Sequence, residues 1–385
     1  MINKLDPLLV SKITMQSVNQ KPIDCIVYSN NYFLTKLILN KNFKNVLLTE
    51  FPFIKAFALK LLPNQISKIA NLNTVNYISS SLKVQTQVNV AKQIIELKNK
   101  QNLSHNFTCA VIDTGISPIL DLCVPKNRIV KFIDFVNDKI KPYDDNGHGT
   151  FIASVMCGNG CVSCKKYVGI DENIKLIGIK ALDCNGEASV INILKAMQWV
   201  VDNQKKYNIK LVCMSFGSLV LANNDPLILG AEVLWDNGVC VVAAAGNSGP
   251  ESATIKSPGA SSKIITVGAI NDFRNNEIFN FSKFEVADFS SRGPILNNYK
   301  PDVVAPGVNI NSACNFKLDK QHYKTMSGTS VATPIVAGVC SLLIAKNPNL
   351  KPNEIKQIIL KNTIKLSNDR NSEGFGLVNC KNFVF

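Results

Sequence analysis

The 385-residue chain lacks the two features that would direct it to a membrane. No uninterrupted apolar run reaches the roughly 18 residues that a transmembrane helix requires. The first twenty residues scatter Asp6, Pro7, Lys12 and Gln16 among apolar positions, so they lack the charged start and continuous apolar segment of a secretory signal. We therefore expect a cytoplasmic protein, with release by lysis or by another route left open.

Acidic residues are also scarce. The chain holds 28 Asp and Glu against 42 Lys and Arg, a formal net charge of +14, and residues 51–95 contain no acidic residue at all. Half of the excess charge lies in residues 1–87, which carry ten lysines and three acidic residues. These lysines are dispersed among asparagines rather than gathered with aromatic residues or along one helix face. This pattern argues against nucleic acid or a membrane surface as a partner.

Cysteine is plentiful, with twelve residues in a chain without a visible secretory signal. That combination favours reduced thiols over a disulfide framework. Three cysteines lie close together in the sequence, Cys157, Cys161 and Cys164, and the last two have the spacing of metal ligands. If these three bound a metal ion, the fourth ligand would have to be Cys123 or Cys184. Structural zinc normally takes two such pairs and only one is present, so we favour free thiols over a metal site.

The chain is long enough, and with 46% hydrophobic residues apolar enough, for a large core plus one small domain. After a leader of residues 1–21, residues 22–87 predict strands and helices in the order β-α-β-β-α-β, a small α+β unit of the ferredoxin-like kind. One of its helices should begin at Pro63. In residues 88–385, strand-length apolar runs alternate with helical stretches. This alternation predicts an α/β domain with a parallel sheet covered by helices on both faces.

Three short blocks of sequence bring an Asp, a His and a Ser in that order. They are Asp113-Thr114-Gly115, Gly147-His148-Gly149-Thr150 and Gly328-Thr329-Ser330-Val331-Ala332-Thr333-Pro334. Asp113 closes the apolar run 108–112, which predicts a buried parallel strand whose C-terminal end faces the ligand crevice. His148 and Ser330 each open an apolar helical stretch, so both should lie at helix N-termini. Together they are candidates for the acid, base and nucleophile of a serine hydrolase.

A fourth block supplies an amide for the negative oxygen that such a reaction develops. The apolar run 239–243 ends in a glycine-rich turn that carries Asn247, and a free backbone N–H is expected at Ser330. Taken singly, each block has an ordinary explanation as a turn or a helix cap. Four blocks in one order, with roles that complement one another, favour catalysis.

In order and content these four blocks resemble the subtilisin-like serine peptidases, from about Asn89 to the C-terminus. The resemblance implies that Ser330 attacks a peptide carbonyl and that His148 takes the hydroxyl proton. Asp113 would orient the imidazole, and Asn247 and the Ser330 N–H would hold the oxyanion, with no cofactor required for catalysis.

Residues 22–87 resemble the propeptide of this family. The resemblance implies a pro-domain that acts as an intramolecular inhibitor, with its tail at residues 84–87 in the active cleft. Self-cleavage is then expected near Gln87 and Val88.

The resemblance also implies where a protein or peptide substrate binds. Its chain would pair as a strand with two backbone edges, Ser215-Phe216-Gly217 and Asn185-Gly186-Glu187. Phe216, Leu182 and Val190 would line an apolar subsite, although Phe216 could equally fill the core. Gly246 and Gly259 are expected beside the specificity pocket.

Lys256 is the sharpest departure from the family pattern, because the position two residues before Pro258 is usually small. A cation at the floor of the specificity pocket would favour Glu, Asp or Gln before the scissile bond. The alternative is that the flexible stem carries the ammonium to solvent and leaves apolar walls to define the pocket.

Structural calcium is common in the family, and Asp121 falls where a calcium-binding aspartate often lies. The glycine- and asparagine-containing loop expected further along is replaced by the segment that bears Cys157, Cys161 and Cys164. The matching site cannot be assembled from the sequence, so calcium dependence stays open.

Two other functions compete with peptide hydrolysis. A pseudo-peptidase would keep the fold and bind without catalysis, but the presence of Asp113, His148, Ser330 and Asn247 argues against it. An esterase or lipase of the α/β-hydrolase kind would carry its serine in Gly-x-Ser-x-Gly and a different triad order.

Overall fold

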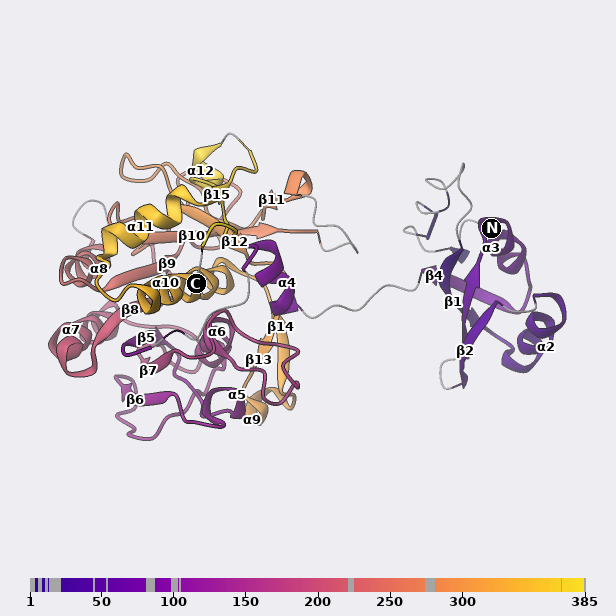
Figure 1. Cartoon of the computed structure of the whole chain (residues 1–385), viewed down its shortest axis with the longest axis horizontal. Coiled ribbons are helices and arrows are strands. Elements are labelled where there is room, and N and C mark those ends of the chain that lie inside the picture. Colours follow the sequence, from indigo (N-terminus) through magenta and orange to yellow (C-terminus); the bar gives the residue numbers. More distant parts are fainter. Residues whose placement is uncertain are drawn as a thin grey trace. The chain divides into compact units, whose positions relative to one another are not determined.

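The computed structural model describes residues 4–5, 9–10, 13, 22–43, 46–52, 55–80, 87–97, 103, 105–220, 225–273, 281–367 and 369–383. The chain divides into two compact units, Met1–Val84 and Gln85–Phe385 (Figure 1). Most of the expected leader and the expected tail at 84–86 lie outside the described residues.

The first unit has the predicted order of elements (Figure 1). They are β1 (Ile23–Ser29), α2 (Tyr32–Asn42), β2 (Leu47–Phe51), β3 (Ala56–Leu61), α3 (Pro63–Ala70) and β4 (Val75–Ser80). The strands pair antiparallel in the order β2-β3-β1-β4. Pro63 is the first residue of α3, where its missing N–H is not needed. Phe57, Leu59 and Ile66 are fully buried in the core of this unit.

The second unit is built on a ten-stranded sheet in the order β15-β16-β12-β10-β9-β8-β5-β7-β6, with β11 beside β10. Its strands are β5 (Thr108–Asp113), β6 (Ile129–Asp134), β7 (Lys175–Lys180), β8 (Ile209–Met214), β9 (Cys240–Ala244), β10 (Ile265–Asn271), β11 (Glu285–Val286), β12 (Val303–Pro306), β15 (Thr363–Ile364) and β16 (Leu377–Val378). All neighbours pair parallel except β15 with β16 and β10 with β11. A separate antiparallel hairpin consists of β13 (Ile310–Ala313) and β14 (Tyr323–Met326).

Helices cover the sheet on both faces, which confirms the predicted fold class. They are α4 (Gln87–Ile94), α5 (Leu120–Cys123), α6 (His148–Cys157), α7 (Val190–Tyr207), α8 (Pro226–Asp236), α9 (Phe316–Asp319), α10 (Thr329–Lys346), α11 (Pro352–Lys361) and α12 (Arg370–Glu373), with a 3-10 turn at Phe281–Lys283. Helix α10 lies across β8, β9, β10 and β12 and contacts α6, whereas α7 and α8 pack together against β5, β8 and β9. Every residue of β5 and β9 is buried, as the near-continuous apolar runs of central parallel strands require.

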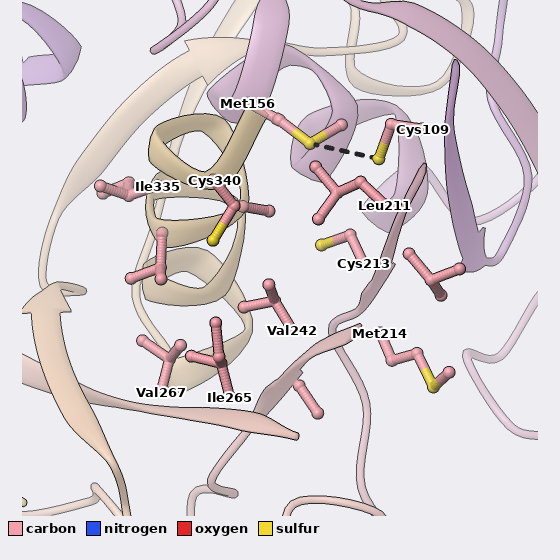
Figure 2. Packing of buried hydrophobic residues seen from close by; sticks show 14 of the residues in the cluster. Cys109, Met156, Leu211, Cys213, Met214, Val242, Ile265, Val267, Ile335 and Cys340 are labelled. Atoms are coloured by element: carbon pink, nitrogen blue, oxygen red, sulfur yellow. Dashed lines mark hydrogen bonds between the residues drawn. The ribbon is translucent and has the colours of Figure 1, made fainter. Parts of the chain in front are cut away.

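The core beneath the active site is aliphatic and sulfur-rich (Figure 2). Figure 2 shows Cys340 of α10 pointing toward Val242 and Ile265 of the sheet, with Ile335 on the left side of the same helix. On the neighbouring side, the Cys109 thiol of β5 lies 3.8 Å from the sulfur of Met156 in α6. Burial raises the pKa of the Cys109 thiol well above its ordinary value, so this thiol stays protonated inside the core.

Helix α10 is the candidate membrane span, by length and composition, among the described residues. Its 18 residues are long and apolar enough to cross a membrane by length and composition, with a mean hydropathy of 1.6. However, 89% of the helix is buried inside the protein, and apolar residues surround its axis because the helix lies in the middle of the core.

Candidate active site

The carboxyl end of β5 and the first residue of α6 bring Asp113 and His148 together. His148 Nδ1 lies 2.7 Å from Asp113 Oδ1. Because a carboxylate can only accept, Nδ1 carries the hydrogen and Nε2 is left with a lone pair. The Asp113 side chain is 1% exposed and that of His148 is 21% exposed, so the imidazole connects a buried charge to the surface. As the sequence predicted, Asp113 ends a buried strand and His148 begins a helix.

The close approach of these two side chains depends on Gly149. A Cβ added at this residue would lie 3.0 Å from Asp113 Cβ and 3.1 Å from Asp113 Oδ1. Such contacts are tighter than ordinary van der Waals distances, so a larger residue would push the start of α6 away from β5. The glycine after His148 therefore has a packing role in the site.

Asp144 organises this corner of the site, and the sequence analysis did not find it. Its carboxylate is buried and accepts from Thr114 Oγ1 at 2.9 Å, Gly147 N at 2.7 Å and Thr150 N at 2.8 Å. Thr114 Oγ1 in turn accepts from Gly149 N at 2.9 Å. These bonds tie the segment after β5 to the first turn of α6. The signal in the sequence was an acidic residue shortly before a helix start.

The part of the site around Ser330 is built on Gly328, which precedes α10. A Cβ added at Gly328 would lie 3.0 Å from Ser330 Oγ, 3.3 Å from Asn247 Nδ2 and 3.7 Å from Ser330 N. The hydroxyl, the amide nitrogen and the backbone nitrogen therefore converge on one small space that only glycine leaves open. Gly328 also has φ +154°, which disfavours other residues.

Thr329 sets the orientation of the Asn247 amide, and this role was also missed. Asn247 Oδ1 accepts from Thr329 N at 2.9 Å and from Thr329 Oγ1 at 2.9 Å. Both groups are donors in these bonds, so the amide oxygen is held by the helix start and Nδ2 is turned toward Ser330. Thr329 Oγ1 also accepts from Gly246 N at 3.1 Å, which links the turn after β9 to α10.

The pKa of His148 is raised above its ordinary value of 6.5. Burial of the ring favours the neutral form and by itself would lower the pKa. The charge of Asp113 and its hydrogen bond raise the pKa by more than burial lowers it. Asp144 adds to the rise and the Lys324 ammonium opposes it. The neutral imidazole, the form that can accept a proton, therefore predominates only on the alkaline side of 6.5.

The first predicted substrate edge continues from β8. Ser215 is buried, Phe216 is half-buried and Gly217 is exposed. The next residue, Ser218, pairs antiparallel with Ser257 through two backbone bonds of 2.9 Å. That pairing joins the edge to the segment that carries Lys256.

The second predicted edge contains a turn. Asp183 Oδ1 accepts from Asn185 N at 2.8 Å and from Glu187 N at 3.0 Å, and Gly186 lies at φ +81°. Asn146 Nδ2, two residues before His148, donates to Cys184 O at 3.0 Å. Asp183 N also donates to Glu187 O at 2.8 Å, so Asn185 and Gly186 lie inside a turn that Asp183 and Glu187 close.

The three apolar residues assigned to a subsite all pack on the main core cluster. Leu182 is 5% exposed, whereas Phe216 and Val190 are only partly buried. Phe216 and Val190 therefore keep apolar surface accessible, as a subsite requires.

The stem of Lys256 passes between Gly217 and Gly246. A Cβ at Gly217 would lie 2.6 Å from Lys256 Cβ, and a Cβ at Gly246 would collide with Lys256 Cγ. Lys256 N donates to Ala245 O at 2.9 Å, which aligns its backbone with the end of β9. Gly259 also approaches closely, because a Cβ there would lie 2.7 Å from Ala244 O. The half-buried Lys256 thus lies beside Gly217 of the first predicted substrate edge and beside Gly246, which is expected next to the specificity pocket.

The surroundings of Asp121 do not fit a calcium ion. Its Oδ1 accepts from Val162 N at 3.0 Å and its Oδ2 accepts from Tyr323 Oη at 2.7 Å. The Arg128 guanidinium donates to the backbone oxygens of Asp121, Cys157 and Glu172. Hydrogen-bond donors and a protein cation therefore face the oxygens that calcium would need, and the candidate ligand Asp121 is corrected to a structural residue.

The cysteine cluster is divided between core and surface. Cys157 is buried in α6 and its thiol donates to Ala153 O at 3.2 Å, whereas Cys161 and Cys164 are exposed in the turn that follows. Among the described residues, no group of three or more His, Cys, Asp or Glu side chains is placed to hold a metal ion.

The buried carboxylate of Asp113 is bonded to the imidazole of His148 at the start of α6. At the start of α10, the hydroxyl and the backbone nitrogen of Ser330 converge with the amide nitrogen of Asn247. This arrangement defines a hydrolase of the serine type. The chain belongs to the subtilase family of peptidases, whose family model matches residues 104–377. It is therefore a subtilisin-like serine protease, which hydrolyses peptide bonds in proteins.

Relatives of known sequence and structure agree with this assignment. The chain is 37% identical over 374 residues to the serine protease AprX of Bacillus subtilis, covering 90% of this chain and 83% of that protein. It is 32% identical to the alkaline elastase YaB of a Bacillus strain, covering 87% and 81%. Among solved structures, the S41 psychrophilic protease matches with a TM-score of 0.63 and 25% identity, covering 78% of this chain and 99% of that one.

Proposed function

We propose that this subtilase is an endopeptidase in which Ser330 is the nucleophile, His148 the general base and Asp113 the residue that orients it. Asn247 Nδ2 and the Ser330 backbone N–H are the proposed oxyanion donors. The observation that carries the proposal is the convergence of Ser330 Oγ, Asn247 Nδ2 and Ser330 N on one space beside Gly328.

The proposed reaction begins when Ser330 Oγ attacks the scissile carbonyl and its proton passes to His148 Nε2. The carbonyl oxygen becomes negative and accepts from Asn247 Nδ2 and the Ser330 N–H. His148 then gives its proton to the leaving amine, and an acyl-enzyme remains on Ser330. Water, deprotonated by the same imidazole, attacks the acyl carbon; the bond to Ser330 Oγ breaks, the imidazolium returns its proton to Oγ, and the second product leaves. Asp113 stays ionised and stabilises the imidazolium in both halves.

A fluorophosphonate probe tests the nucleophile and the base together. We expect Ser330 Oγ to displace fluoride and become phosphonylated, with Ser330 identified by peptide mapping. The labelling rate should rise with pH and reach half of its maximum above pH 6.5, because only the neutral imidazole accepts the hydroxyl proton and the pKa of His148 is raised. Lys324→Met should move the midpoint further up, since this ammonium lowers the pKa of His148.

Two results would count against these roles. A label mapped to another residue would remove Ser330 as the nucleophile, and a labelling rate independent of pH between 5.5 and 9 would remove His148 as the base. Parallel assays on peptide and acyl-ester substrates separate a peptidase from an esterase.

For substrate preference, we propose that Lys256 selects Glu, Asp or Gln before the scissile bond. The support is its position, because the stem runs between Gly217, in a proposed substrate edge, and Gly246, beside the proposed pocket. The ammonium carried by this half-buried residue can offer a charge-assisted hydrogen bond to a carboxylate. It makes burial of a purely apolar side chain less favourable.

A set of peptides that differ only in the residue before the cut tests this preference. With Glu, Gln, Leu and Phe in that place, the kcat/KM ratio of Glu to Gln should fall roughly 10- to 100-fold in Lys256→Met. Lys263→Met is the matched control, because Lys263 lies on the same segment but pairs with Asp236 at 2.7 Å. A best substrate with Phe or Leu, unchanged by Lys256→Met, would end the proposal.

The first unit is the proposed pro-domain, and cleavage near Gln87 and Val88 would release it. The support is its β-α-β-β-α-β order ahead of the peptidase unit. Helix α4 begins at Gln87, and a substrate of this kind is bound extended, so its first turn must open before the cut. A reducing, cytoplasmic location stays a prediction from the cysteine content.

A further inference from the structure

Three buried charged side chains lie together beside residues 262–264, which directly precede β10. Asp302 is flanked by two ammonium groups, with Lys300 Nζ 2.6 Å from its Oδ2 and Lys356 Nζ 2.9 Å from its Oδ1. Lys300 is 1% exposed, Asp302 7% and Lys356 9%. Two cations therefore share one anion away from water, which requires further oxygen partners for the ammonium protons.

Those partners are backbone carbonyls, and Lys356 has most of them. Its Nζ donates to Ser262 O at 3.0 Å, Lys263 O at 3.1 Å and Ile264 O at 2.8 Å. With Asp302 Oδ1, four oxygens surround this nitrogen. Three successive carbonyls and a carboxylate form the kind of all-oxygen set that hard metal cations take in proteins.

The four oxygens around Lys356 Nζ connect α11 and β12 to residues 256–264, which we call the specificity segment. Lys356 comes from α11 and Asp302 immediately precedes β12, whereas the three carbonyls belong to residues 262–264, which follow Gly259. Lys300 Nζ also lies 2.9 Å from Thr266 Oγ1, and that hydroxyl donates to Gly259 O at 2.6 Å. The hydrogen-bond network therefore reaches the proposed pocket wall.

Charge balance shows why both lysines matter. Burial lowers the pKa of Lys300 to about 8, with Asp302 opposing the fall and the nearby charge of Lys356 adding to it. The Lys300 charge is thus lost at mildly alkaline pH, and Lys356 is then the partner that neutralises Asp302. The cation that holds three carbonyls and the carboxylate is Lys356.

We propose that Lys356 is a tethered cation that takes the place of a bound metal ion beneath the specificity segment. Removing its side chain should leave a latent site for a small monovalent cation, lined by Ser262 O, Lys263 O, Ile264 O and Asp302 Oδ1. Arg128 holds the three carbonyls beside Asp121 in the same manner. The inference concerns stability and is independent of the proposed catalytic roles.

Cation rescue of a cavity variant tests the proposal by melting temperature alone. The full chain carrying Ser330→Ala, which prevents self-digestion, is compared with the same chain carrying Lys356→Ala as well, at pH 7. We expect Lys356→Ala to lower Tm by roughly 5–15 °C in tetramethylammonium chloride, because three carbonyls and Asp302 Oδ1 lose the ammonium that they share, while Lys300 remains bonded to Asp302 Oδ2. Potassium or ammonium chloride should then restore at least half of the loss, with a rise that depends on salt concentration.

Two comparisons make the result specific. The parent chain with Lys356 should melt within about 2 °C in all three salts at equal ionic strength. Lys356→Met, whose thioether fills the space, should be destabilised without rescue. The proposal would be overturned if Lys356→Ala had the same Tm in potassium and tetramethylammonium salts. It would also be overturned if potassium raised the Tm of the parent chain as much as that of Lys356→Ala. If Lys356→Ala is insoluble, the same responses of Lys356→Ser, which also leaves the space open, decide.

Discussion

Replacing Ser330 by alanine is expected to lower kcat for peptide hydrolysis by roughly 10⁶-fold, the size of the effect in the related enzyme subtilisin. KM should change little, because the proposed substrate edges and the Asn247 amide remain. The physical reason is that the acyl-enzyme route needs an oxygen nucleophile at the convergence point beside Gly328. The remaining donors can only polarise a carbonyl for attack by water.

The measurement is turnover of a chromogenic peptide, together with fluorophosphonate labelling and the mass of the purified chain. The Ser330→Ala chain should bind no label and should keep its first unit, whereas the wild type should lose residues up to about Gln87. Ser327→Ala serves as the matched control, because Ser327 is exposed just before Gly328. Residual turnover above a hundredth of wild type would refute the assignment of the nucleophile. An uncut wild-type chain with full activity would refute only the processing.

Replacing Asn247 by alanine is expected to lower kcat by about 10²–10³, again the magnitude observed for subtilisin itself. The amide nitrogen meets the carbonyl oxygen as that oxygen becomes negative, so its loss should reduce kcat and leave KM within a few-fold. Thr329→Val should show a smaller loss in the same direction. It removes one of the two donors that hold Asn247 Oδ1, but it keeps the backbone bond of 2.9 Å.

Steady-state kinetics of these variants separate an oxyanion donor from a structural amide. Ser248→Ala, the next residue and also exposed, is the control for the turn. If Asn247→Ala raised KM and kept kcat, Asn247 would contribute to substrate binding and not to the transition state. A Thr329→Val loss as large as that of Asn247→Ala would mean that Thr329 has a further role beyond orienting the amide.

Much of the fold could be read from local pattern. The runs 108–112 and 239–243 are apolar throughout because central parallel strands are buried on both faces, and they became β5 and β9. Pro63 opens α3 because proline tolerates a first helical turn. Strand β6 was not predicted, since this edge strand includes exposed Val130 and half-buried Lys131 and lacks a clean apolar run. The two-residue strands β15 and β16 are too short to show any period.

The sequence alone was enough to predict the candidate site residues and their order, namely Asp113, His148, Asn247 and Ser330. This was possible because apolar runs and glycine-rich turns mark strand ends and helix starts locally. The tertiary fold alone decided which groups hold them. Asp144 accepts from both sides of the site, Thr329 turns the Asn247 amide, Lys256 threads between Gly217 and Gly246, and Lys356 fills an oxygen cage. These contacts join residues from different parts of the chain. Such contacts produce no repeating pattern in the sequence, so they could not be predicted from it.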